Sequence, residues 1–440
     1  MANFAKPSAP RFTAEVYQNE FLPVGGRDVH AIVSVTATGG ATATQAALPG
    51  SAAVVIMVDC SGSMQYPPSK MEGARQATAA AVDTLRDGTP FAVIAGTHVA
   101  REVYPGQGRL AVADPATRDR AKEALRHLEP GGGTAIGTWL RLADGLFRGS
   151  SAAIRHGILL TDGRNEHEEP ERLRATLEAC AGRFTCDARG VGTDWEVKEV
   201  TGIAGALLGT ADIVADPAHL AEDFRRMMEK TMGKEVADVA LRLWTPVGAE
   251  IQYVKQVAPS VLDLTDRRTG AGPRAGDYPT GSWGDESREY HVCVRVPQAA
   301  VGQEMLAARA SLVVPGPSGA APSVLAQGLV RAVWTDDLAA STALNPQVAH
   351  YTGQAELAQA IQQGLEARKT GDIGGATAKL GRAVQLASAS GNEDTAKLLA
   401  KVVDVVDAAA GTVRLKAKVA DADEMTLETR STQTVRVKKT

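Results

Sequence analysis

Hydrophobic and polar positions follow two different periods along the chain. Between residues 52 and 232, continuous apolar runs such as AVVIMVD and HGILLTD alternate with segments whose apolar positions recur every three to four residues. Continuous runs of this length are typical of strands buried on both faces, and the segments between them are typical of amphipathic helices. The alternation predicts a doubly wound, Rossmann-like α/β domain, in which helices cover both faces of a parallel sheet.

Period-two patterns flank this region on both sides. Residues 11–48 contain DVHAIVSVTAT, and residues 235–336 contain VALRLWTPV, EIQYVKQV and EYHVCVRVP. One face of the last run is shared by Tyr290, Val292, Val294 and Val296. Such alternation predicts an antiparallel β-sandwich. We expect the N-terminal strands to join it, so that the α/β domain is inserted in the β-domain, and we expect the Gly/Pro/Asp-rich residues 266–288 to separate two strands.

Residues 346–410 return to a helical period. Gly371-Asp372 and Gly391-Asn392 divide them into three helices, which predicts a small α-helical bundle. The hairpin around Gly371 faintly resembles a tetratricopeptide unit, but a single bundle is the simpler interpretation. The remaining residues are polar and Thr-rich, and part of them could form a strand. The predicted division is 1–50 (N-terminal strands and linker), 51–232 (α/β domain), 233–338 (β-sandwich), 345–410 (helical bundle) and 411–440 (polar tail).

The overall composition narrows the choice of function. The net charge of -4, from 47 basic and 51 acidic residues among 440, gives no electrostatic footprint for nucleic acid. No apolar run approaches 18 residues and the N-terminus lacks a secretory h-region, so we expect neither a membrane span nor secretion, and the expected compartment is the cytoplasm. The four cysteines form no CxxC; Cys180 and Cys186 could pair, but separate thiols are the expectation.

The segment VVIMVDCSGSMQ carries the chemistry of the α/β region. Asp59, Ser61 and Ser63 stand at alternate positions directly after a buried strand. Open α/β sheets bind ligands at the carboxyl ends of their strands. Carboxylate and hydroxyl oxygens suit Mg²⁺ or Mn²⁺ better than zinc. Taken alone, D-x-S-x-S is more often a capped turn than a metal site.

Two further segments supply matching oxygen donors. GGGTAIGT places Thr134 at the start of a helix, after glycines that allow close backbone approach, and ILLTDGRNE places Asp162 at the end of another buried strand. This set resembles the metal-ion-dependent adhesion site (MIDAS) of von Willebrand factor A domains: D-x-S-x-S, then a threonine, then an aspartate. All five positions are filled, and the resemblance covers residues 52–232.

The resemblance implies a protein-interaction module of a bacterial intracellular type. Two carboxylates and neutral hydroxyls leave a bound cation with residual positive charge and an exchangeable water, which an Asp or Glu of a partner protein could displace. Enzyme signatures are mostly absent: no P-loop and no nucleophile elbow occur. Two alternatives stay open, a metal-dependent hydrolase with His167 as a conceivable base, and an adaptor subunit for an AAA+ ATPase on another chain.

Two polar segments have weaker interpretations. NEHEEP, residues 165–170, could hold a second ion or shape partner choice, but a solvated loop before a helix starting at Pro170 is the expected state. The tail carries Thr426, Thr429, Thr432 and Thr434 among charged residues. Phosphorylation of one of them would create a site for a phosphothreonine-reading partner, while a structural terminus is the simpler expectation.

Overall fold

The computed structural model describes residues 10–39, 52–316 and 320–437, and the chain divides into two compact units. Unit 1 is formed mainly by residues 52–237, and unit 2 by residues 10–38 with most of 238–437. Unit 2 is therefore assembled from segments before and after unit 1 in the sequence. The Ala/Thr/Gly-rich linker expected near residues 40–50 lies outside the described residues.

Unit 1 contains a seven-stranded sheet with the order β10-β9-β8-β4-β5-β6, in which β7 also pairs with β5. Its strands are β4 (Ala52–Asp59), β5 (Pro90–Gly96), β6 (Arg101–Tyr104), β7 (Ala111–Val112), β8 (Ile154–Thr161), β9 (Thr185–Val191) and β10 (Ala211–Val214). The five strands from β10 to β5 are parallel, as their apolar runs predict, whereas β6 and β7 pair antiparallel with β5. All eight residues of β4 are buried, which explains its unbroken apolar pattern.

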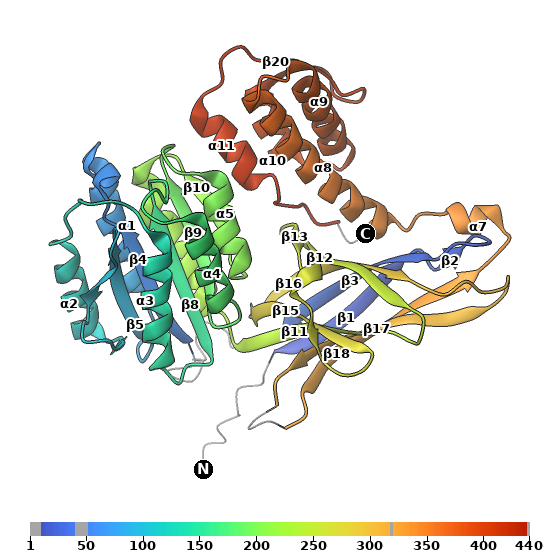
Figure 1. The fold of residues 1–440 in the computed structure, drawn as a ribbon, viewed down its shortest axis with the longest axis horizontal. Helices are drawn as coiled ribbons and strands as arrows, with labels where there is room; N and C mark the ends of the chain where they lie inside the picture. Colours follow the sequence, from blue (N-terminus) through green and yellow to red (C-terminus); the bar gives the residue numbers. More distant parts are fainter. Residues whose placement is uncertain (1–9, 40–51, 317–319, 438–440) are drawn as a thin grey trace. The chain divides into compact units, whose positions relative to one another are not determined.

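Helices cover both faces of this sheet (Figure 1). They are α1 (Ser69–Thr84), α2 (Pro115–Leu125), α3 (Ile136–Arg148), α4 (Pro170–Cys180), α5 (Val197–Ala206) and α6 (Leu220–Met232), with the 3₁₀ turns η1 (Gly62–Gln65) and η2 (Pro217–His219). Apolar residues of α1, α2 and α6 share one core with β4. The helix α2 begins where its sequence indicates. Asp114 and Thr117 form a reciprocal capping box, and Pro115 occupies the first helical position, where its missing amide hydrogen is not needed.

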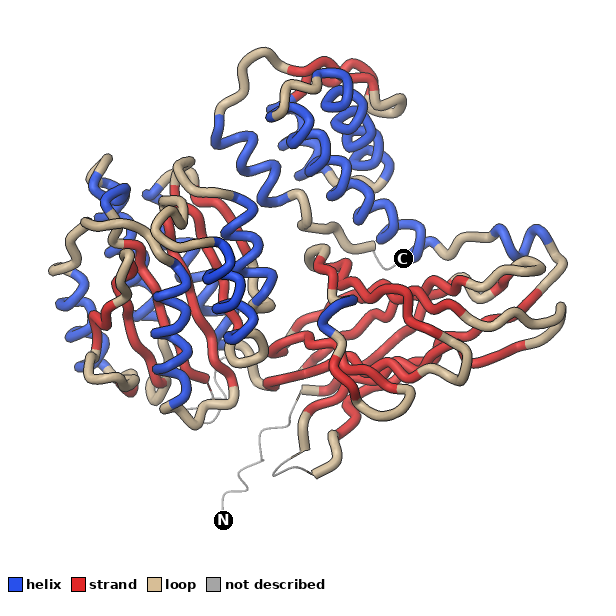
Figure 2. The backbone as a smooth tube through the Cα atoms, viewed as in Figure 1, coloured by secondary structure: helices blue, strands red, loops and turns tan. Residues whose placement is uncertain are grey.

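Unit 2 contains a five-stranded sheet, β1-β3-β16-β12-β13, and a six-stranded sheet, β14-β15-β11-β17-β18-β2. The strands are β1 (Arg11–Gln18), β2 (Phe21–Leu22), β3 (Asp28–Thr38), β11 (Val236–Trp244), β12 (Glu250–Ala258), β13 (Leu262–Asp263), β14 (Thr269–Gly270), β15 (Ala275–Trp283), β16 (Glu286–Arg295), β17 (Glu304–Val314) and β18 (Ser323–Trp334), with η3 (Thr265–Arg267). The N-terminal β3 pairs antiparallel with β16 along most of its length (Figure 2). Sheet pairing thus joins a segment that precedes unit 1 in the sequence to one that follows it.

The expectation that residues 266–288 merely separate two strands is wrong. This stretch contains β14 and β15 and the start of β16. Tyr278 and Trp283 of β15 are fully buried, and the hydroxyl of Thr280 donates to the carbonyl of Val239 on β11. The Gly and Pro content conceals the strand, because these residues normally weaken a strand assignment while two large aromatic residues provide the burial that holds it.

Helices dominate the C-terminal part of unit 2, which contains α7 (Leu338–Thr342), α8 (Pro346–Lys369), α9 (Ile373–Ala389), α10 (Glu393–Val402), β19 (Val403–Asp407), β20 (Thr412–Leu415) and α11 (Asp421–Arg430). The divisions at Gly371-Asp372 and Gly391-Asn392 are where the sequence places them. Asp372 and Asn392 are the N-caps of α9 and α10, and their side chains accept hydrogen bonds from backbone amides.

Two expectations for this region need correction. The helical segment ends at Val402, and Val403–Asp407 forms the strand β19, which pairs with β20. The β-branched run VDVVD favours a strand over another helical turn. The polar tail contains the helix α11, and Leu427 of α11 is fully buried in the same core as Leu380 and Leu399.

Two simpler expectations concern the cysteines and the membrane. All four cysteines are free and buried, so Cys180 and Cys186 are separate thiols. Among the described helices, none combines the length and the apolar character needed to cross a membrane.

Candidate metal site

The predicted ligands converge at one edge of the unit 1 sheet. Asp59 is the last residue of β4, and Asp162 follows the last residue of the neighbouring parallel strand β8. From β4 the chain continues to β5 on one side, and later fills the other side with β8, β9 and β10. The site therefore lies where the strand order reverses, the position at which open α/β sheets bind ligands.

Asp59 is completely buried and its two carboxylate oxygens have separate partners. The Ser61 amide donates to Oδ1 at 2.8 Å, and the Thr161 hydroxyl donates to Oδ2 at 2.7 Å. Burial raises the pKa of Asp59 to about 6, against the opposing effect of these hydrogen bonds. A buried carboxylate with a raised pKa is poised to gain from a bound cation, which would compensate its charge.

A line of hydroxyls connects the first motif to the second aspartate. The Oγ atoms of Ser61 and Ser63 lie 2.9 Å apart, and Ser63 Oγ donates to Asp162 Oδ1 at 2.7 Å. Thr134 faces the same place, because a Cβ added at Gly163 would lie 2.9 Å from Ser63 Oγ and 3.6 Å from Thr134 Oγ1. Ser63 is exposed while the aspartates are buried, so the group opens to solvent on the Ser63 side.

Backbone hydrogen bonds fix the GGGT loop against the first motif. The Gly62 amide donates to the Gly132 carbonyl, and the Gly131 amide donates to the Cys60 carbonyl, both at 2.8 Å. Gly132 has a φ of +80°, a conformation that favours glycine. The triple glycine thus lets the loop carrying Thr134 lie directly beside the D-x-S-x-S turn.

The expectation of a merely solvated loop at NEHEEP is wrong for two of its residues. Asn165 Oδ1 accepts a hydrogen bond from the Ile136 amide at 2.7 Å, and Glu168 Oε2 accepts one from the Gly137 amide at 2.7 Å. The Asn165 residue and the Glu168 side chain are buried, so they satisfy donors at the start of α3. The His167 ring covers Gly133, where an added Cβ would come within 2.3 Å of it. This segment positions Thr134.

Lys70 is the main residue of this site that motif reasoning missed. It lies on α1 with its side chain 8% exposed, and its Nζ contacts Asp162 Oδ2 at 2.7 Å and Asp194 Oδ2 at 2.9 Å. Burial opposes its charge, but the hydrogen bonds to the two aspartates raise the pKa of Lys70. No spacing rule marks it, because a single lysine on an amphipathic helix normally faces solvent.

The donor set fits a hard divalent cation. Two carboxylates and three hydroxyls lie around one place, and all are oxygen donors of the kind that Mg²⁺ and Mn²⁺ prefer. Among the described residues, no group of three or more His, Cys, Asp and Glu side chains gathers in the way a zinc site would require. Asp59, Ser61, Ser63, Thr134 and Asp162 would therefore hold such a cation, with Lys70 beside it.

Comparison with known proteins agrees with this geometry. A family model described as the von Willebrand factor type A domain matches residues 52–213, and one described as the von Willebrand factor type A C-terminal domain matches residues 385–431. The solved structure of von Willebrand factor type A from Catenulispora acidiphila is 53% identical, with a TM-score of 0.92 over 98% of this chain and 99% of that one. The chain belongs to the von Willebrand factor type A family.

More distant matches support the same fold. The ArnB paralog VWA2 from Sulfolobus acidocaldarius is 15% identical, with a TM-score of 0.57 over 95% of this chain and 97% of that one, so the von Willebrand factor type A fold and its additional sheets and helices recur there. An uncharacterized protein of Synechocystis sp. is 28% identical over 57% of this chain. The alignment spans 59% of the length of that curated relative.

Proposed function

We propose that this von Willebrand factor type A protein binds a partner protein through a divalent cation, Mg²⁺ or Mn²⁺, held at an intact metal-ion-dependent adhesion site. One observation carries the proposal: Ser61, Ser63 and Asp162 form a continuous hydrogen-bonded line beside the buried Asp59, and Thr134 faces it. When bound, the cation would offer an open coordination position to an Asp or Glu of the partner.

The chain's own residues prepare this site for a carboxylate ligand. Asp59 and Asp162 supply the anionic donors, and Lys70 already neutralises part of their charge. Together with Lys70, a bound divalent cation would balance the nearby aspartates, so that the site would not repel an acidic partner. Exposed apolar side chains on nearby loops add contact surface: Tyr66, three residues after Ser63, is 83% exposed, and Val99, beside the His98 that contacts the Gly133 amide, is 61% exposed.

The hydrolase alternative gains no support from His167. Its Nδ1 lies 3.3 Å from the Thr134 amide, and this hydrogen bond occupies the nitrogen that would have to remove a proton from water. We therefore propose a binding function without turnover. Four free buried thiols suit a reducing compartment, which supports our further proposal that the protein works inside the bacterial cell.

Calorimetry with Mg²⁺ and Mn²⁺ tests the metal site directly. Asp59→Ala and Asp162→Ala should each weaken binding by at least about tenfold, without unfolding, because neither side chain contributes to the apolar core. Asp119→Ala, which removes an exposed carboxylate from α2, is the matched control and should bind as the wild type does. Unchanged affinity in both site variants would overturn the assignment.

Affinity capture then tests the partner. The full-length protein should retain a protein from native lysate in Mg²⁺ and release it on EDTA treatment, and Asp59→Ala should not retain it. A captured protein whose binding survives both EDTA and Asp59→Ala would contradict metal-dependent recognition. A metal-dependent phosphatase or protease rate that disappears in Asp59→Ala would show that the site is catalytic.

A further inference from the structure

Three polar side chains meet on one face of the five-stranded sheet of unit 2. His30 lies on β3, His291 on β16 and Tyr253 on β12, and these strands are adjacent in the order β3-β16-β12. His291 is buried, and the other two are half-buried. The helix α8 packs against the same face near Ile32, two residues beyond His30. This cluster is in unit 2 and takes no part in the metal site of unit 1.

The three polar atoms form a nearly equilateral triangle. His30 Nδ1 lies 3.1 Å from Tyr253 Oη and 3.3 Å from His291 Nε2, and Tyr253 Oη lies 3.2 Å from His291 Nε2. If all three groups are neutral, only two of the three atom pairs can form a hydrogen bond. For example, the phenol can donate to one imidazole and accept from the other. The third edge, between the two imidazole nitrogens, then has no proton of its own.

A tetrahedral cation would account for all three edges. Ligands that bind zinc at about 2.0–2.1 Å in tetrahedral geometry lie about 3.3–3.4 Å from one another. The observed edges of 3.1, 3.3 and 3.2 Å fall within a few tenths of an ångström of that spacing. We propose that His30, Tyr253 and His291 form a second metal site, for Zn²⁺ or another imidazole-preferring transition ion, with one coordination position left for water or a further ligand.

The surroundings suit imidazole ligands. Burial lowers the pKa of His291 to about 3 and also lowers the pKa of His30, which favours the neutral form of each ring, the form that binds a cation. Burial raises the pKa of Tyr253, so the phenol keeps its proton until a cation displaces it. Binding at this site should therefore release a proton.

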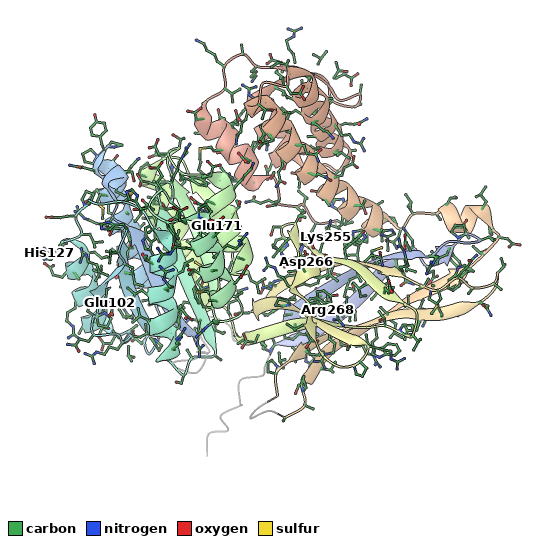
Figure 3. The ribbon with its side chains drawn as sticks, in the orientation of Figure 1. Glu102, His127, Glu171, Lys255, Asp266 and Arg268 are labelled. Atoms are coloured by element: carbon green, nitrogen blue, oxygen red, sulfur yellow. The ribbon has the colours of Figure 1, made fainter. Side chains whose placement is uncertain are left out.

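Nearby charge limits the affinity of this site. Lys255, labelled in Figure 3, places its Nζ 5.1 Å from the Tyr253 ring centroid and opposes a second cation. The third ligand is a phenol, so the cluster differs from a zinc site built from His, Cys and carboxylate side chains alone, and no group of three such side chains that could hold a metal ion occurs among the described residues.

Cobalt substitution in the full-length protein tests the proposal. Co²⁺ in a tetrahedral site with nitrogen ligands absorbs strongly in the visible range, whereas Co²⁺ bound by six oxygens, as would be expected at the proposed unit 1 site, absorbs weakly. One equivalent of Co²⁺ should give the strong spectrum, and Zn²⁺ should displace it. His30→Gln and His291→Gln should weaken Co²⁺ binding by at least about tenfold, and Tyr253→Phe should shift the spectrum and abolish proton release at this site.

Controls separate this site from the first one and from misfolding. His127→Gln, which changes an exposed histidine also labelled in Figure 3, should leave the spectrum unchanged. Asp59→Ala should keep the strong spectrum, and Zn²⁺ should raise the melting temperature of this variant but not that of the double variant Asp59→Ala/His291→Gln, in which both sites are removed. A wild-type protein that shows only the weak spectrum would overturn the proposal, as would a strong spectrum unaffected by His291→Gln in a protein that still melts cooperatively.

Discussion

The two proposed metal sites differ in where their donor residues lie on neighbouring strands. In unit 1 four of the five donors lie at or just after the carboxyl ends of two parallel strands, and three of these stand within five residues, from Asp59 to Ser63. In unit 2 the donors lie on one face of an antiparallel sheet, and His30, Tyr253 and His291 are far apart in the chain. A local motif can reveal the first arrangement, but only strand register brings together the second.

The two sites also differ in how burial acts on their donors. Burial of the Asp59 carboxylate raises its pKa, so the ionised site is strained until a cation arrives. Burial of His30 and His291 lowers their pKa values and leaves neutral rings that need no compensation. The unit 1 site should therefore depend more strongly on charge than the unit 2 site, and the following variants test this difference and the cores that support it.

The largest expected effect is on the core of unit 2. Thr429 is 3% exposed on α11, and its hydroxyl has no hydrogen-bond partner among the described residues. Thr429→Glu would bury an unpaired carboxylate and should lower the free energy of unfolding by about 3 kcal/mol or more. Thr426→Glu, on a half-buried position of the same helix, should lower it by less than about 1 kcal/mol. Urea denaturation measures both.

The same pair of variants bears on phosphorylation of the tail. A phosphate recognised by a partner should be found on Thr426 and not on Thr429, and phosphopeptide mass spectrometry of the native protein would show which residue carries it. Tolerance of Thr429→Glu would mean that α11 does not belong to the core of unit 2.

The next effect concerns Asp59 in the absence of metal. Because the pKa of Asp59 is about 6 in the folded protein against 3.8 for an ordinary aspartate, the native state binds more protons than the unfolded state between those values. Stability should therefore fall as pH rises from 4 to 6, by an amount on the order of 3 kcal/mol for about two pKa units. Asp59→Asn lacks this loss, since the amide can still accept from the Ser61 amide and meet the Thr161 hydroxyl.

Thermal melts in EDTA would measure this difference. Asp59→Asn should melt above the wild type at pH 7, and the gap should narrow towards pH 4. A variant that melts below the wild type at pH 7 would mean that Asp59 is already compensated in the metal-free protein.

A site residue or an element could be predicted from the sequence where its pattern lies within one short segment of the chain. The ligands Asp59, Ser61, Ser63, Thr134 and Asp162 were recognised because each follows a strand or precedes a helix that has its own pattern. Lys70 was missed, and Asn165 and Glu168 were expected in a solvated loop, since the partners of these side chains are set by packing between separate elements. The strand β15 was missed because Gly and Pro outweighed its two buried aromatics, and α11 because its apolar face is narrow and its first turn is acidic.

A third variant tests whether the close contact between Gly133 and the His167 ring keeps Thr134 in position. Gly133→Ala would place its Cβ 2.3 Å from the His167 ring, so the ring or the loop must move, at a cost of about 1–3 kcal/mol. The Mg²⁺ affinity should fall with the displacement of Thr134. Gly131→Ala is the matched control, because nothing lies within 4 Å of a Cβ added there. Equal affinities for the two variants in calorimetry would show that the loop position does not matter to the site.

The smallest expected effect, and the one that most directly tests the role of charge, is that of Lys70→Met. The Lys70 ammonium lies 2.7 Å from Asp162 Oδ2, and a bound divalent cation must share that carboxylate with it. Replacing it with an apolar side chain of similar length should raise Mg²⁺ affinity by about tenfold, or about 1.4 kcal/mol. It should also lower the metal-free stability, because Asp162 loses a buried ion pair.

Lys122→Met is the matched control for this variant. Lys122 pairs with Asp83 and Asp119 on a partly exposed surface, where an ion pair contributes little, so neither quantity should change appreciably. Zn²⁺ binding at the unit 2 cluster should be unaffected by both variants. Weaker Mg²⁺ binding by Lys70→Met would reverse the interpretation, because it would mean that the lysine orients Asp162 for the cation and does not compete with it.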